Sequence, residues 1–177
     1  MSVLAGPFAI ACVLLLGAGV LKAWNPGDTA NALRTVGVPV SYAASRGLVR
    51  AFGAVEAVLA AIALFTGNPI AAVLVAASYL AFAGFVVVAL RRGAAIASCG
   101  CFGKVDTPPS VVHVVLDLCF AGVAIAVAFT GDVALPDVLR DQPLAGVPFA
   151  LLLAIGVYLV FLAFTALPKT MAAVRGG

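Results

Sequence analysis

Charged residues are scarce in this sequence. Asp, Glu, Lys and Arg make up 10% of the 177 residues, while hydrophobic residues make up 64%. An ordinary soluble domain carries roughly 25% charged residues. The composition therefore excludes a soluble globule, and no nucleic-acid partner is expected.

The sequence also lacks the motifs of several enzyme and metal-binding classes. It contains no phosphate-cradling glycine loop, no zinc-ligand set and no serine-nucleophile elbow. Its single histidine, His113, excludes a His-rich metal site within one chain. The first apolar stretch has no basic residue before it and no convincing small-residue cleavage site after it. We therefore expect a retained span there and not a signal peptide.

Long apolar stretches are what the sequence has in abundance. A helix that crosses the roughly 30 Å of bilayer hydrocarbon needs about 20 mostly apolar residues. Five stretches meet this requirement, over 3–21, 47–66, 69–90, 109–131 and 144–167. The sequence thus predicts a single all-α transmembrane domain over 1–177, a membrane bundle of about five helices with a four-helix core and a C-terminal span.

The basic residues are distributed unevenly about these spans. With five spans, one face of the membrane receives every Lys and Arg except Arg140. By the positive-inside rule, that face is cytoplasmic. We expect a multi-pass protein of the cytoplasmic (inner) membrane, with its N-terminus outside and the loop that carries Cys99 inside.

Three connections between the spans carry structural predictions. Asp28 is expected to cap a short helix that ends near Gly37. This helix has an amphipathic pattern and is either a segment that lies at the membrane interface or simply a connector. Ala32, Leu33 and Val36 lie on one side of it, and Asn31, Arg34 and Thr35 lie mostly on another. The turn at 66–69 is too short for anything but an antiparallel hairpin, so the second and third spans are expected to pack side by side. Segment 132–143 is expected to be a solvated loop.

Two cysteines one residue apart are the most informative feature. Residues 98–103 read Ser-Cys-Gly-Cys-Phe-Gly, which places Cys99 and Cys101 in a glycine-containing loop. Such thiols can form a disulfide that cycles with a partner thiol, or can bind a soft ion such as Cu(I) or Hg(II) together. A disulfide across one intervening residue closes a small, strained ring, which favours a transient bond. The bland alternative is a pair of ordinary reduced loop cysteines.

Ionisable residues within the spans form a second group of candidates. Glu56 lies near the middle of the second span, where an ionised carboxylate is costly. Its expected partner is either Lys22 or the pair His113 and Asp117. His113 and Asp117 lie four residues apart on one helix face, where they either handle protons or form a structural contact.

Two further cysteines lie within spans. Cys12 and Cys119 are expected to behave as small apolar residues, with a relay to the loop thiols as the alternative. At about 100° per residue, Cys119 is rotated roughly 200° from Asp117 and so faces away from it.

These features together resemble the MauE/DoxX-like family of small membrane proteins, over roughly residues 3–131. The resemblance implies a polytopic bundle associated with thiol and disulfide handling, beside a thioredoxin-like protein, in the maturation of exported proteins. Asp117 stands where relatives are expected to carry an Arg-Asn type pair. The features that carry the resemblance are Lys22, the segment 32–34 with Gly37 and Pro39, Glu56, and residues 99–103 before a proline-led helix.

The leading hypothesis is a membrane thiol–disulfide redox protein. Cys99 and Cys101 would exchange with a thioredoxin-like partner, as in a thiol–disulfide oxidoreductase, while Glu56, His113 and Asp117 handle protons. Oxidative maturation takes place outside the cytoplasm, whereas the charge bias puts the loop thiols inside. Either electrons cross the bundle, with a quinone or the span thiols as acceptor, or one of these two inferences is wrong. Two alternatives stay open: binding or transport of a soft metal ion by the same loop thiols, and a non-catalytic subunit or assembly factor of a larger membrane complex.

Overall fold

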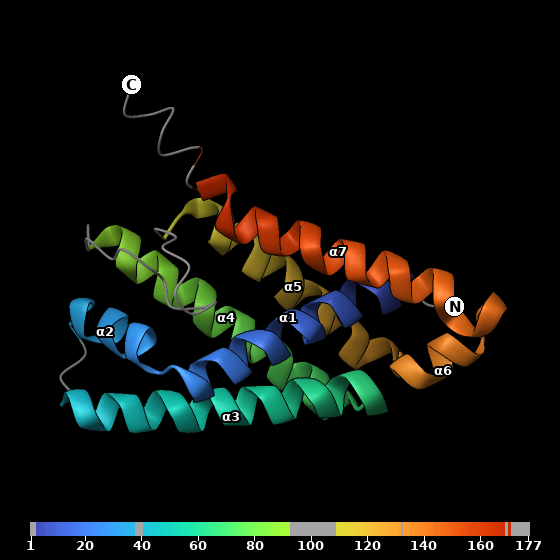
Figure 1. Cartoon of the computed structure of the whole chain (residues 1–177), viewed down its shortest axis with the longest axis horizontal. Helices are drawn as coiled ribbons and strands as arrows, with labels where there is room; N and C mark the ends of the chain where they lie inside the picture. Colours follow the sequence, from blue (N-terminus) through green and yellow to red (C-terminus); the bar gives the residue numbers. More distant parts are fainter. Residues whose placement is uncertain (1–2, 38–40, 93–108, 132, 169, 171–177) are drawn as a thin grey trace.

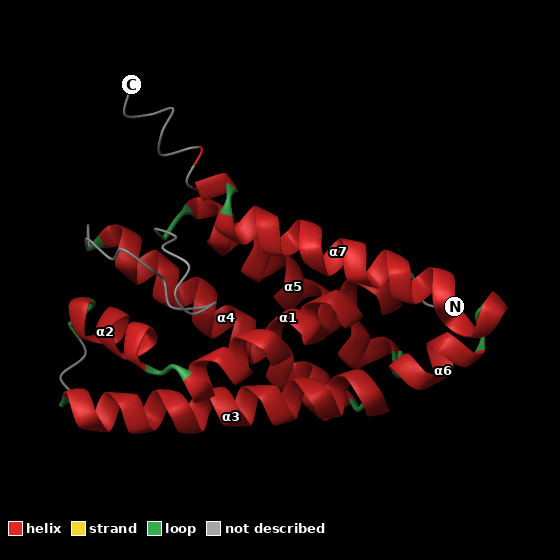
Figure 2. Cartoon of the chain, viewed as in Figure 1, coloured by secondary structure: helices red, strands yellow, loops and turns green. Residues whose placement is uncertain are grey.

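The computed structural model describes residues 3–37, 41–92, 109–131, 133–168 and 170. All regular elements in these ranges are helical, as Figure 2 shows. Five helices are long and apolar enough to cross a membrane, which confirms the predicted fold class. They are α1 (Ala5–Trp24), α3 (Tyr42–Thr66), α4 (Pro69–Arg91), α5 (Val111–Thr130) and α7 (Val147–Thr165). The shorter elements are α2 (Gly27–Thr35), α6 (Leu135–Arg140) and the 3-10 helix η1 (Pro143–Gly146).

Helix α1 runs through the middle of the bundle, between α3 and α7 (Figure 1). Helices α2 and α6 lie at opposite ends of the molecule. The end of α4, the beginning of α3 and the beginning of α5 share the end where α2 lies. Cys99 and Cys101 are outside the described residues, in the segment that connects α4 to α5.

The outward faces of the helices are apolar. On α3, Val55 and Val58 are exposed to 63% and 60%, and on α7, Leu152 is exposed to 68%. A soluble protein would hide such side chains, whereas a helix that faces lipid carries them on its surface. Exposure of this kind agrees with a bundle surrounded by hydrocarbon.

Two glycines allow a very close contact between the backbones of α1 and α3. A Cβ atom at Gly19 would lie 2.6 Å from the carbonyl oxygen of Gly53, and one at Gly53 would lie 2.7 Å from the carbonyl oxygen of Gly19. The two backbones are therefore too close together for a side chain at either position. By contrast, a Cβ at Gly17 would meet nothing within 4 Å, so that glycine plays no part in the contact.

The hairpin between α3 and α4 forms as predicted, but the two helices part beyond it. Gly67 adopts a left-handed conformation with φ of +62°, and the side chain of Asn68 accepts hydrogen bonds from the first N–H groups of α4. Past this turn, α3 packs mainly on α1, and α4 packs mainly on α5. Helices α3 and α4 therefore contact each other less than α3 contacts α1 or α4 contacts α5, so the predicted side-by-side packing forms only in part.

Helix α2 occupies the space between the separated ends of α3 and α4. Ala32 of this helix and Val36, its C-cap residue, are buried and cluster with Ala89 and Phe85 of α4. Its other face is exposed, as the amphipathic pattern predicts. The arginine at the end of α4, Arg92, donates a hydrogen bond to the backbone carbonyl of Val36.

Two local predictions need correction. Asp28 does not cap α2: the helix begins at Gly27, its N-cap residue is Pro26, and no side chain caps it. Asp28 instead lies in the first turn, where a carboxylate interacts favourably with the helix dipole. Segment 132–143 is not simply a solvated loop, because it contains α6 and buries Val138 at 9% exposure.

Candidate functional site

A buried ion pair joins the last turn of α1 to the middle of α3. Nζ of Lys22 donates to Oε2 of Glu56 at 2.8 Å, and the two side chains are 3% and 1% exposed. The close approach at Gly19 and Gly53 brings the helices together one turn away. Of the partners expected for Glu56, the structure therefore selects Lys22.

Two aromatic rings lie close to the Lys22 ammonium. Nζ lies 3.8 Å from the centre of the Phe82 ring and 5.9 Å from that of Phe52. A cation over a ring face is stabilised by the ring quadrupole, more strongly where water is excluded. The sequence indicated Lys22 only as one possible partner of Glu56, since a lysine near a helix end usually reaches the membrane surface.

Glu56 keeps one unused acceptor. Its Oε1 atom is buried and has no hydrogen-bond partner among the described residues. A buried acceptor without a donor typically costs about 1–3 kcal/mol. The carboxyl group can therefore still accept a proton or a hydrogen bond while Oε2 holds Lys22.

His113 and Asp117 form a second buried pair, on α5. They are 3% and 4% exposed, and they share one helix face as predicted. Nδ1 of His113 shares a hydrogen bond of 2.9 Å with Oγ of Ser110, the N-cap residue of α5. Cys119, two residues beyond Asp117, is exposed, which confirms that it faces away from this pair.

The two pairs are neighbours separated by one aromatic ring. His113 and Asp117 line a cavity of about 20 Å³, enough for a single water molecule. Phe82 lies on the wall of this cavity and also contacts the Lys22 ammonium. The bundle thus holds Glu56, Lys22, Asp117 and His113 in one buried polar region, and among the described residues the ion-pair partner of Glu56 is Lys22.

Of the other three cysteines, one lies in a span and two lie in the loop between α4 and α5. Cys12 is fully buried in the main core and packs as a small apolar residue. Cys99 and Cys101 lie outside the described residues, in the segment between Arg92 and Pro109, and Pro109 stands four residues before His113. Among the described residues, no group of three or more His, Cys, Asp or Glu side chains could hold a metal ion.

Comparison with known proteins places the chain in a family. A family profile described as "Methylamine utilisation protein MauE" matches residues 1–130. The matched range ends with the last residue of α5 and so includes both buried pairs, whereas α6 and α7 follow it. Searches of curated proteins and of solved structures gave no match. Since the profile covers well over half of the sequence, this chain belongs to the MauE family of membrane proteins.

Proposed function

We propose that this protein is a membrane thiol–disulfide redox protein that exchanges electrons with a thioredoxin-like partner through Cys99 and Cys101. One observation carries the proposal: the helix that directly follows the segment with these thiols holds two buried ionisable side chains, His113 and Asp117. His113 lies within the first turn of α5 after that segment. Family membership adds a link to methylamine utilisation, in which the protein would help to mature an exported component.

The exchange itself requires only the two loop cysteines and the partner. A thiolate of the partner attacks one sulfur of the Cys99–Cys101 disulfide and forms a mixed disulfide. The second thiolate of the partner then displaces the loop cysteine. The partner leaves as a disulfide, and the loop pair has gained two electrons and two protons as a dithiol.

The buried polar region fits the proton side of this reaction. Each turnover of a dithiol moves two protons along with two electrons, so proton acceptors are needed near the thiols. Oε1 of Glu56 is an unused acceptor, and His113 and Asp117 border a cavity the size of one water molecule. In our proposal, these three residues take up and pass on protons while Lys22 holds Glu56 in place.

The proposal is tested by exchange with reduced thioredoxin as the probe. The oxidised full chain in detergent is mixed with reduced thioredoxin, and alkylation followed by mass spectrometry measures the loss of free thiols from the probe. Replacing Cys99 and Cys101 with alanine should lower the exchange rate by at least about 100-fold, because the thiolate is the exchanging group.

The matched control removes the other two cysteines. The double variant Cys12→Ala and Cys119→Ala should retain a rate within about twofold of the original, because neither thiol takes part in the exchange step. Unchanged exchange in the loop variant would contradict the proposed function. It would leave the protein as a subunit that needs no redox thiols of its own.

A further inference from the structure

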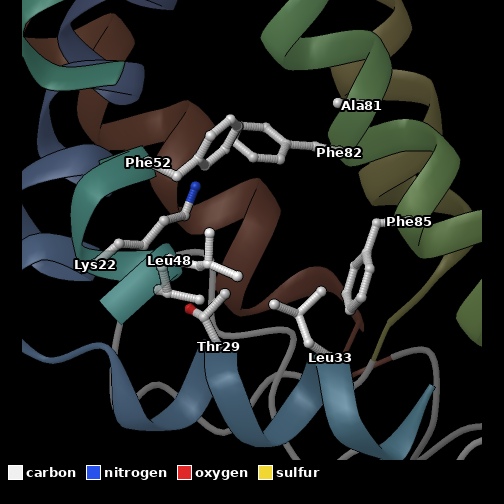
Figure 3. Close-up of a pocket in the computed structure, with 9 residues that line it drawn as sticks. Lys22, Thr29, Leu33, Leu48, Phe52, Ala81, Phe82 and Phe85 are labelled. Carbon is white, nitrogen blue, oxygen red and sulfur yellow. The ribbon is translucent and has the colours of Figure 1, made fainter. Parts of the chain in front are cut away.

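A groove of about 310 Å³ lies between α2, α3 and α4, next to Lys22 (Figure 3). It exists because α3 and α4 separate beyond their hairpin while α1 ends at Trp24. Helix α2 forms one wall. Its lining consists of Lys22, Thr29, Leu33, Leu48, Val49, Phe52, Ala81, Phe82 and Phe85.

The groove opens on the outer surface of the bundle. Leu48 and Phe52 on its rim are exposed to 60% and 48%. Figure 3 shows the ammonium of Lys22 directed towards the rings of Phe52 and Phe82, with Leu33 on the opposite side. A molecule from the surrounding hydrocarbon that enters the groove therefore comes next to Lys22, which carries a charged hydrogen-bond donor.

The lining distinguishes between classes of lipid-soluble ligand. An ammonium group has three N–H donors, and among the described residues the hydrogen-bond acceptor of Lys22 is Glu56. Because Glu56 balances the charge of Lys22, the groove offers little net attraction to an anionic head group. An acyl chain could fill the space but could not accept a hydrogen bond. A neutral, flat ring with carbonyl oxygens meets both requirements, since it accepts from Lys22 and packs against phenyl rings.

We propose that this groove binds the head group of an isoprenoid quinone, with Lys22 donating a hydrogen bond to a quinone carbonyl oxygen. The volume is near the lower end of the range for small-molecule sites, which suits one ring system and leaves the isoprenoid tail in lipid. Phe52, Phe82 and Phe85 form the ring-packing walls.

The inference rests on the proposed function in one respect, which is the use made of the bound quinone. The loop dithiol of Cys99 and Cys101 gives up two electrons and two protons and becomes a disulfide again. The quinone takes up the same two electrons and two protons and leaves as the quinol. The partner dithiol is thereby oxidised at the expense of the membrane quinone pool.

Photolabelling of the full chain in nanodiscs tests the site. The probe is an azido-benzoquinone with a short isoprenoid tail, and labelled peptides are identified by mass spectrometry. Label is expected in the peptides that contain Phe52 and Phe85, and excess ubiquinone-1 should compete for it. The substitution Ala81→Phe fills the groove and should weaken labelling at least about tenfold.

The control places the same substitution one helical turn away. Ala77 is also exposed on α4 but does not line the groove, so Ala77→Phe should label like the original chain. Competition by oleate as strong as that by ubiquinone-1 would overturn the inference in favour of a general acyl-chain site. An unchanged amount of label in the Ala81→Phe variant would overturn the inference as well.

A loop variant separates this inference from the proposed function. The double variant Cys99→Ala and Cys101→Ala should bind the probe as well as the original chain, because the described residues that line the groove come from other parts of the chain. Saturable, groove-specific labelling combined with cysteine-independent thioredoxin exchange would support the quinone site while contradicting the redox role of the loop. Absence of groove-specific labelling combined with cysteine-dependent thioredoxin exchange would contradict the quinone site while supporting the redox role of the loop.

Discussion

At the scale of single residues, the Lys22–Glu56 ion pair is the feature with the largest expected effect on stability. Lys22→Met removes the cation and leaves a carboxylate at 1% exposure without its partner. Breaking a buried pair in this way costs about 3–5 kcal/mol. We expect a loss of that size in the free energy of unfolding, measured by denaturant titration in mixed micelles. The double variant Lys22→Met and Glu56→Gln should recover most of it, because no unpaired charge stays buried.

The exposed ion pair on α6 provides the control. Arg140 lies 3.5 Å from Asp137, and the two side chains are 80% and 71% exposed. Exposed pairs contribute about 0–1 kcal/mol, so Arg140→Ala should change stability within that range. Equal losses of unfolding free energy for Lys22→Met and Arg140→Ala would show that burial of the Lys22–Glu56 pair adds nothing to its effect on stability.

The sequence identified most residues of the buried polar region but not their pairing. Glu56, His113 and Asp117 stand out because ionisable side chains are rare in apolar stretches. The choice of Lys22 as the partner of Glu56 depends on the depth and rotation of α1 relative to α3. Those are set by the contact of Gly19 with Gly53, which hydropathy does not reveal.

At the scale of helices, that same glycine contact makes a specific prediction. In Gly19→Ala, the new methyl group would lie within 3 Å of the backbone of Gly53 and Ala57, and backbone cannot rotate away. Overpacking of this kind costs about 1–3 kcal/mol. Gly17→Ala, two residues away on the same helix, adds its methyl group to open space and should leave stability unchanged or slightly raised. Thermal unfolding of both variants in one detergent measures the difference, and equal melting temperatures would refute the close contact.

Helix positions followed from hydropathy, whereas their mutual arrangement did not. The five predicted spans agree with the observed helices to within a few residues, because only a helix satisfies its own backbone in hydrocarbon. The separation of α3 from α4 was not predicted, since it depends on each helix having a better partner elsewhere. Helix α6 was missed because its six residues give too short a pattern.

At the scale of the whole molecule, orientation in the membrane decides how the redox proposal works. Lys22 was counted among the basic residues of one face, but it is buried and neutralised by Glu56. The remaining basic residues of that face, which include Arg46, Arg50 and Arg92, keep the bias in the same direction. By the positive-inside rule, the end with α2 and the loop of Cys99 and Cys101 would face the cytoplasm.

Maleimide labelling of these two loop thiols in intact cells tests the orientation, on the variant Cys12→Ala and Cys119→Ala so that only Cys99 and Cys101 can react. A permeant maleimide should label the loop thiols after reduction, whereas a membrane-impermeant maleimide should label them only after the cells are opened. This result would require electrons to cross the bundle before an exported protein can be oxidised. Labelling by the impermeant reagent in intact, reduced cells would reverse the orientation and allow direct exchange with an exported partner on the outer face.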